Sequence, residues 1–419
     1  MKRQTRTFLL FLTVSLVFRG LFLCLFHERI SADLRNWDDV ADCFRRGENP
    51  YQATSVLVWP PVWMQIIFFC DRISQFMHWR FFAVVKGFLI LGECALAGLL
   101  CATIVRFTKS KDVAKTIIIG MAINPICIYQ VCLHGNFDVL VGFWILLAVH
   151  MLLRFQENQE PQFWLLACFA LGMGAVTKTV PLSLAPLLLL SARKLKPSEL
   201  GLGAALLLGP ILLGLSILYV LTPADIATKV LGYRSSPVQF GFSGLLGIFG
   251  AHGLRAVWTV VFEILYGGGW ILSGIWLLTR ETLDRRRIIS LAALLLLAVV
   301  AFGPGGGLHY VYWFLPLLLL QYELEGRKTR LFLLVLYAVA AASYTLEYAL
   351  SDAYGSFLLD LTQNESLLKW ARAITTGTDE TMVMLPLWVL YCFYVIHAGA
   401  VIGREMSSDL RGLFWRKQF

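Results

Sequence analysis

The sequence contains few charged residues: Asp, Glu, Lys and Arg make up 15% of its 419 residues, whereas 58% are hydrophobic. It also lacks a polar stretch long enough for a soluble domain, and it has no Gly-rich phosphate loop of the kind that soluble nucleotide-binding enzymes use. The apolar residues instead fall in runs long enough to cross a bilayer of about 30 Å. These features indicate a multispanning membrane protein.

Two further absences restrict the kind of membrane protein that this sequence can form. The nine cysteines show no CxxC spacing and mostly lie inside apolar runs, so neither a disulfide framework nor a cysteine-based zinc site is indicated. The apolar runs also lack the two-residue alternation of a transmembrane β-barrel. Because backbone groups in lipid must be paired within their own element, the predicted fold is all-α, a polytopic transmembrane helical bundle.

The formal net charge of +9 raises the question of a nucleic-acid partner. The basic residues, however, form clusters in short segments between apolar runs and near both ends of the sequence, which is typical of cytoplasmic loops. No nucleic-acid partner is therefore expected, and both termini are predicted to be cytoplasmic. The clusters are Lys2, Arg3 and Arg6; Arg106, Lys109, Lys111 and Lys115; Arg193, Lys194 and Lys196; Arg280, Arg285, Arg286 and Arg287; Arg327, Lys328 and Arg330; and Arg404, Arg411, Arg416 and Lys417.

Placing every basic cluster on the inner side gives about twelve spans. The first is interpreted as a retained span and not as a cleaved signal peptide, because Arg19 interrupts it and no small-residue cleavage site follows. Within that span, Arg19 either snorkels to the interface or lines a cavity. The predicted spans are roughly 7–26, 81–105, 115–133, 138–154, 162–177, 179–192, 200–221, 257–279, 288–303, 310–324, 331–350 and 382–403.

Residues 59–79 are apolar as well, but counting them as a span would place the cluster from Arg106 to Lys115 outside. A shallow amphipathic or re-entrant helix is the preferred interpretation. The outer side then carries three long segments, roughly 27–80, 222–256 and 351–381. Because long ordered loops tend to carry function, the active face is predicted to be external.

The first external segment is predicted to hold a helix over residues 33–46, with Ser31 or Asp33 near its start and Gly47 near its end. At about 100° per residue, Asp33 is the only acid on the apolar face of this helix. Asp33 is either an N-cap or a carboxylate beside a cavity; in the second case, desolvation would raise its pKa and suit it to act as a general base. The apolar face is Asp33, Trp37, Val40, Ala41 and Phe44.

The order of these features resembles the GT-C superfamily of membrane glycosyltransferases, which use polyprenyl-phosphate sugars. The resemblance starts with one span and an external loop of the form D, W, A, G-x-NPY, followed by a PP pair in VWPPVW. It continues in NPICIYQVCLHGNFDVLVGFWILLA from Asn124, in GMGAVTKTVPLSLAPLLLL from Gly172 and in GPGGGLHYVYWFLPLLLL from Gly303. The turn after Leu133 reads HGNFD where relatives often carry Gly-Gln, so its role is left open.

This resemblance covers about residues 1–325 and implies a transmembrane catalytic core there, with the external loop at 27–80 as part of it. Residues 326–419 would then hold C-terminal transmembrane helices and a cytoplasmic tail. The family pattern implies that Asp33 is the catalytic carboxylate. It implies no obligatory cofactor, and a divalent metal is left open.

Two cationic side chains are candidates for binding the phosphate of such a donor. Lys178 lies between two apolar segments, where a lone cation either snorkels, serves a helix end or meets an anion such as a lipid phosphate. Arg234, in LGYRSSP, has the planar fork that suits phosphate oxygens, although a surface role is also open.

Five acidic and imidazole side chains, with one neighbouring tyrosine, complete the candidates. His134 and Asp138 are four residues apart and are expected to meet on one helical turn, as a metal pair or as a structural pair. Asp38 and Asp39 are weak metal candidates on the charged face of the 33–46 helix. His309, with Tyr310 beside it, follows three glycines, which suits either a donor pocket or a flexible turn.

The sequence therefore predicts transfer of a hexose, with mannose among the candidates, from a polyprenyl-phosphate donor to a lipid-linked or cell-surface acceptor. The reaction would invert the anomeric centre, in a bacterial plasma membrane or, for a eukaryotic chain, in the endoplasmic reticulum. The alternatives are a transporter or flippase for a lipid-linked sugar and a glycan polymerase or ligase. Paired halves, common in transporters, are not evident in the sequence.

Overall fold

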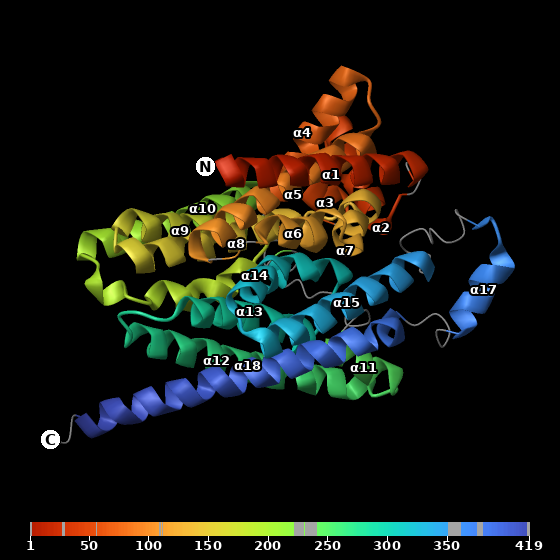
Figure 1. Cartoon of the computed structure of the whole chain (residues 1–419). Helices are drawn as coiled ribbons and strands as arrows, with labels where there is room; N and C mark the ends of the chain where they lie inside the picture. Colours follow the sequence, from red (N-terminus) through yellow and green to blue (C-terminus); the bar gives the residue numbers. More distant parts are fainter. Residues whose placement is uncertain are drawn as a thin grey trace.

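The computed structural model describes residues 2–26, 30–55, 57–108, 110, 112–221, 230, 241–350, 362–374 and 380–416. These residues form helices joined by turns and short connections, and no strand occurs among them (Figure 1). The prediction of an all-α fold is confirmed for this part of the chain.

The first half of the bundle contains α1 Lys2–Phe26, α2 Ala32–Arg45, α3 Pro50–Ala53, α4 Pro61–Met77, α5 Phe81–Phe107, α6 Val113–Ile117, η1 Ile118–Ala122, α7 Pro125–Tyr129, η2 Gln130–His134, α8 Asp138–Asn158, α9 Pro161–Thr177, η3 Val180–Leu189, η4 Ala192–Lys194 and α10 Pro197–Leu221. Five of these helices begin at a proline. Proline suits the first helical position because its φ is preset and the missing N–H would have no intrahelical partner there.

The second half contains α11 Gly241–Ile248, α12 His252–Leu278, α13 Arg285–Phe302, η6 Leu308–Tyr310, α14 Val311–Leu324, α15 Arg327–Leu350, α17 Glu365–Ile374 and α18 Glu380–Arg416. In the packed interior, α8 contacts α5, α9 and α14, and α9 contacts α10. On the other side of the bundle, α18 packs against α13 and α15. The interior is therefore continuous from the first part of the chain to the last.

Seven described helices are long and apolar enough to cross a membrane: α1, α5, α8, α10, α12, α15 and α18. The bent pair formed by α6–η1 and α7–η2 raises this number to eight if it is one span. Three further predicted spans coincide with apolar helices of 10 to 17 residues, α9, η3 and α14. The structure thus supports a multi-pass helical membrane protein, and twelve spans remain a prediction.

The break between the two halves of the bent pair has a local cause. The halves meet at 44°. Asn124 caps the second half, since its side chain accepts a hydrogen bond from the N–H of Ile126, and Pro125 occupies the first position of α7. Because proline cannot donate an N–H, the first half cannot continue its hydrogen-bond ladder through this point.

Arg19 stabilises the same break from α1. Its side chain is fully buried, donates to the carboxylate of Glu93 and also donates to the carbonyls of Met121 and Ala122, at the end of the first half. The hydroxyl of Tyr312 donates to the other oxygen of Glu93. The prediction that Arg19 either snorkels or lines a cavity is therefore wrong, because a buried acid neutralises its charge inside the bundle.

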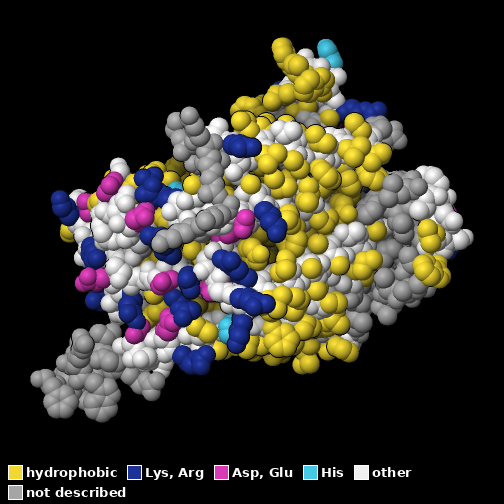
Figure 2. All heavy atoms as spheres, viewed as in Figure 1, with side chains coloured by type: hydrophobic (Ala, Val, Ile, Leu, Met, Phe, Trp, Pro, Cys, Tyr) yellow, Lys and Arg dark blue, Asp and Glu magenta, His cyan; other side chains and the backbone are white. Residues whose placement is uncertain are grey.

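The two ends of the bundle differ in character. The N-terminal end of α1 and the C-terminal end of α18 lie at one end, whereas α2 and α17 lie at the other (Figure 1). On the face seen in Figure 2, hydrophobic side chains cover the middle of the molecule, and most Lys and Arg side chains gather toward the end that holds the termini. A charged end next to an apolar belt is the pattern expected of a membrane protein with basic loops on one side.

Helix α4 corresponds to the ambiguous segment 59–79. With 17 residues it is not among the helices long enough to span, and it projects from the bundle across the direction of α1 (Figure 1). Its large apolar side chains Phe69, Ile73 and Phe76 are exposed. The helix has the composition of one that lies at a membrane surface, which stays the preferred prediction.

Candidate active site

Two side chains of the α2 region form hydrogen bonds to the backbone at the end of η2 and in the turn that follows it. The Ser31 hydroxyl accepts a hydrogen bond from the N–H of Leu34 at 3.1 Å, so Ser31 is the N-cap, and it also donates to the carbonyl of His134. The indole N–H of Trp37 donates to the carbonyl of Gly135 at 3.1 Å. Of the two predicted helix starts, Ser31 is therefore the cap, and the carboxylate in the first turn of α2 has other partners.

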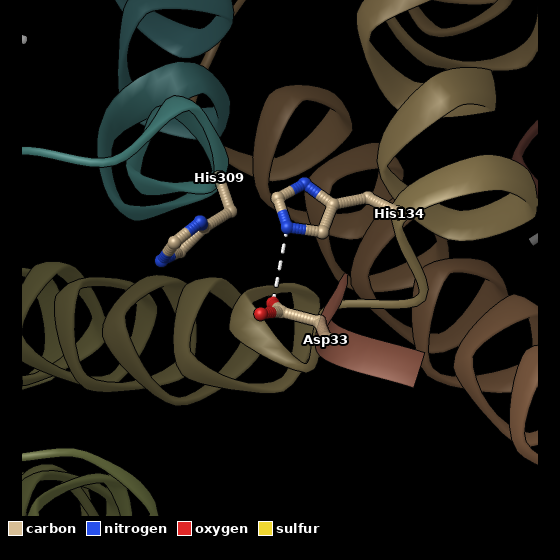
Figure 3. Close-up of side chains that lie close together, drawn as sticks. All are labelled: Asp33, His134 and His309. Atoms are coloured by element: carbon tan, nitrogen blue, oxygen red, sulfur yellow. Dashed lines mark ion pairs between the residues drawn. The ribbon is translucent and has the colours of Figure 1, made fainter. Parts of the chain in front are cut away.

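That carboxylate, Asp33, points into a cluster of polar side chains (Figure 3). Its Oδ2 accepts a hydrogen bond from Nδ2 of Asn136 at 2.6 Å and lies 3.0 Å from Nε2 of His134. Its Oδ1 has no hydrogen-bond partner among the described residues, and the side chain is 21% exposed. One oxygen is thus held in place while the other is open to an incoming group.

The electrostatic setting keeps Asp33 ionised. Burial by itself raises the pKa of this carboxyl, but the charge and hydrogen bond of His134, together with His309 and Asn136, lower the pKa below its usual value of 3.8. The prediction that desolvation raises the pKa of Asp33 is therefore wrong in direction. At neutral pH the carboxylate is present in the form that accepts a proton.

The turn from His134 to Asp138 joins two helices. Helix η2 ends at His134 because Gly135 adopts a left-handed conformation, with φ of 69°. A Cβ at Gly135 would lie 2.5 Å from the side chain of Leu34, so glycine also permits the close approach of α2. Asn136 Oδ1 accepts from the N–H of Asp138 at 2.9 Å. The expected pairing of His134 with Asp138 on one helical turn is wrong, since the left-handed residue separates their helices.

Asp138 pairs instead with Lys178. The Lys178 Nζ atom lies 2.9 and 3.1 Å from the two carboxylate oxygens of Asp138, whose side chain is fully buried. The same ammonium lies 4.5 Å from the ring centre of Tyr310, 5.0 Å from that of Trp313 and 5.5 Å from that of Phe137. Lys178 is therefore not the lone cation expected from the sequence; it meets an anion of its own chain inside an aromatic wall.

His309 stands between the two acidic groups. It lies in the short helix η6, and a Cβ at the preceding Gly307 would come within 2.5 Å of its ring. Its Nε2 is 3.7 Å from Oδ2 of Asp138, and its ring is 5.2 Å from that of His134 at an interplanar angle of 87°. The Nδ1 atom is buried and has no hydrogen-bond partner among the described residues.

The pKa of His309 is lowered well below 6.5, chiefly because burial disfavours the imidazolium. The nearby charge of Lys178 and the ring of His134 act in the same direction, whereas Asp33 opposes them. His309 is therefore neutral at physiological pH and offers a lone pair to a ligand.

Tyr348 is a site residue that the sequence analysis missed. Its fully buried hydroxyl lies 2.7 Å from Nδ1 of His134, so it contacts the nitrogen opposite the one that faces Asp33. Tyr348 lies in the apolar helix α15, and nothing in the local sequence distinguishes it from other tyrosines of that helix. Asn136, by contrast, lies in the quoted HGNFD turn and could have been singled out there as a polar residue.

The remaining candidates lie elsewhere. Asp38 is 3.3 Å from Arg45 on the charged face of α2, and Asp42 pairs with the same guanidinium. Asp39 is exposed. The described residues place neither Asp38 nor Asp39 in a group of metal-binding side chains, so these weak metal candidates are not supported. Arg234 lies outside the described residues.

Asp33, His134, His309, Asp138 and Lys178 together are called the acid–histidine cluster below. It combines an ionised carboxylate with one open oxygen, a neutral and partly buried imidazole and a buried ion pair, contributed by four separate segments of the chain. Such a set can take a proton from a hydroxyl and bind a polar or anionic group beside it.

No known protein-family model matches the chain, and a search of curated proteins finds no match either.

Proposed function

We propose that this protein is an integral membrane glycosyltransferase of the GT-C type that transfers a hexose, with mannose the first candidate, from a polyprenyl-phosphate sugar to a lipid-linked or cell-envelope acceptor. The observation that supports this most is the Asp33 carboxylate. Asn136 and His134 hold one of its oxygens, and the other has no hydrogen-bond partner among the described residues. An ionised carboxylate with one unpartnered oxygen meets the geometric requirement of a general base.

The proposed reaction is a single displacement. The acceptor oxygen attacks the anomeric carbon of the sugar while the hydroxyl proton passes to Oδ1 of Asp33. A new carbon–oxygen bond forms to the acceptor, and the bond between the anomeric carbon and the phosphate oxygen breaks. The bonding electrons leave with the polyprenyl phosphate, so that the configuration at the anomeric carbon is inverted.

The phosphate side of this reaction needs positive or hydrogen-bonding groups, because negative charge grows on the leaving phosphate. In this proposal, His309 and Lys178 supply these groups, and the rings of Tyr310 and Trp313 form the wall behind them. Asp138 neutralises the charge of Lys178 in the resting protein. The ammonium therefore contributes a hydrogen-bond donor at a fixed position and not a full unpaired positive charge. Arg234 remains a candidate for the same role.

The proposed membrane setting rests on the distribution of charge over the molecule. We place the end with the termini in the cytoplasm and the acid–histidine cluster toward the external side, with about twelve spans in all and α4 along the surface. Because the Lys and Arg side chains gather at the end with the termini, the positive-inside rule supports this orientation. The bacterial plasma membrane is the proposed location, or the endoplasmic reticulum for a eukaryotic chain. Membrane lipids would surround the prenyl chain of the donor.

The test uses purified full-length protein in lipid vesicles, a radiolabelled polyprenyl-phosphate hexose and a cell-envelope lipid extract as acceptor. The proposal predicts one new labelled product that carries a single added hexose of inverted configuration. Movement of intact donor across the vesicle without a glycosidic product would instead establish a flippase. A ladder of products, or transfer of a preassembled glycan, would establish a polymerase or ligase.

A further inference from the structure

We propose that Asp33, His134 and His309 bind a divalent transition metal, for which Zn²⁺ has the most suitable chemistry. The three residues come from α2, η2 and η6, and each offers one ligand atom that lies within 4.8 Å of the other two (Figure 3). Two imidazoles and one carboxylate are a common ligand set of sites that leave a further position for a substrate or water.

One side of the cluster already has the spacing of such a site. Zinc bonds of 2.0–2.1 Å in tetrahedral geometry place neighbouring ligand atoms about 3.3 Å apart. The Nε2 of His134 and Oδ2 of Asp33 are 3.0 Å apart, so little movement is needed on that side. His309 completes the set by a shift of its ring toward the other two residues.

The surroundings also suit metal ligands. A ligating histidine usually has its other ring nitrogen hydrogen-bonded, which fixes the ring and its tautomer. The Nδ1 of His134 has this contact with the Tyr348 hydroxyl at 2.7 Å. The Asp33 carboxylate is likewise held, by the Asn136 amide. These contacts orient two ligand atoms toward one point before any metal is present.

A simple hydrogen bond between His134 and Asp33 explains the contact of those two residues, but it does not explain the third. His309 places a buried Nδ1 without a hydrogen-bond partner among the described residues, and its ring faces that of His134 at 5.2 Å. Burying an unpaired polar atom is unfavourable. A metal bound to one of its ring nitrogens would account for the presence of the imidazole at this position.

The charges of the cluster also favour a bound metal, if the proposed function, with its anionic donor, holds. The cluster holds two carboxylates, Asp33 and Asp138, and Lys178 already forms an ion pair with Asp138. An anionic donor phosphate would therefore approach the unpaired carboxylate of Asp33. A divalent cation on Oδ2 of Asp33 would offset that repulsion and leave Oδ1 to take the proton.

The experiment uses the full-length protein in lipid nanodiscs, stripped of metal by a chelator and dialysed. Metal content after exposure to Zn²⁺ is measured by mass spectrometry, and Co²⁺ is added as an optical probe because its visible absorption reports tetrahedral nitrogen and oxygen ligands. The variants are Asp33→Asn, His309→Gln and the matched control His397→Gln, which removes an exposed histidine of α18. Zinc-dependent thermal stabilisation is recorded on each, so that a misfolded variant is recognised.

We expect one Zn²⁺ per chain and a tetrahedral Co²⁺ spectrum for wild type and His397→Gln, with affinity at least about tenfold weaker in Asp33→Asn and His309→Gln. Equal metal binding by folded His309→Gln and wild type, or no binding by wild type, would overturn the metal site. Failure of the proposed function is distinguishable: a protein that binds the metal but transfers no sugar keeps this inference, and one that transfers sugar but binds no metal loses this inference alone.

Discussion

The Tyr348 hydroxyl lies 2.7 Å from Nδ1 of His134, and Nε2 of the same imidazole lies 3.0 Å from the Asp33 carboxylate. Side chains from α15, η2 and α2 thus form a continuous chain that ends at Oδ2 of Asp33, the oxygen that Asn136 also holds. Helix α15 lies beyond residues 1–325, the part of the chain with the family resemblance. The C-terminal part of the protein therefore contributes a positioning residue to the candidate site.

Tyr348→Phe removes one hydrogen bond to His134 and leaves the aromatic packing intact. If that bond orients the imidazole, its net value of about 1 kcal/mol corresponds to a transfer rate about fivefold lower at saturating donor. The KM for donor is expected to stay the same, because Tyr348 acts through His134. Tyr337→Phe, on the same helix but bonded to the carbonyl of Ile119, is the control. An unchanged rate in Tyr348→Phe would mean that the chain of contacts is only structural.

Lys178→Met and Asp138→Asn each leave the other partner of a buried ion pair uncompensated. Breaking such a pair costs about 3–5 kcal/mol, so each single variant should unfold at a clearly lower temperature. The double variant Lys178→Met with Asp138→Asn should recover much of that loss, because neither charge is then stranded. Thermal unfolding in detergent measures all three. Additive losses in the double variant would show that the two side chains act independently.

Acid should weaken the fold through His309. Its pKa in the folded protein is lowered below the ordinary 6.5, so the unfolded chain binds a proton that the folded chain rejects. The contribution of His309 to stability is complete above about pH 6.5 and falls as the pH drops toward the folded pKa. In chelator-treated protein, the unfolding temperature of wild type should fall more between about pH 7.5 and about pH 5.5 than that of His309→Asn. Parallel pH profiles would contradict this assignment.

Glu93→Ala should damage the bundle more than any exposed substitution. It leaves the buried guanidinium of Arg19 without its acid at the break between the two halves of the bent pair. The expected cost is about 3–5 kcal/mol, seen as poor yield and a lower unfolding temperature. Glu157→Ala, which removes a partly exposed partner of Arg106 and Arg285, provides the comparison. A Glu93→Ala protein as stable as Glu157→Ala would show that the Arg19 pair adds little.

Local sequence patterns predicted the elements well. The amphipathic spacing and the turn residues after Arg46 located α2 within a residue or two, because helix period and capping are local properties. The buried face differed in part: Leu34 and Cys43 are buried with Trp37, Val40 and Ala41, since α2 packs against α4 and, at Leu34, against the distant HGNFD turn. That packing partner cannot be inferred from the pattern of α2 alone.

The site was harder to predict because its contacts join residues far apart in the sequence. Asp33, Lys178 and His309 were each singled out, yet the pairing of Lys178 with Asp138 depends on how α8 and α9 pack. The direction of the Asp33 pKa shift likewise depends on His134, which folding brings into contact. Burial alone predicted the opposite sign.

The most direct test of the account is the rate of sugar transfer by Asp33→Asn compared with wild type and with Glu48→Gln, which removes an exposed carboxylate from the same segment. The variant keeps the shape of the side chain and its contact with Asn136 but cannot take a proton from the acceptor. The account predicts a rate lower by about 10²- to 10⁴-fold at saturating donor and Zn²⁺, with Glu48→Gln near wild type. Transfer by folded Asp33→Asn at the wild-type rate would contradict the assignment of Asp33 as the base.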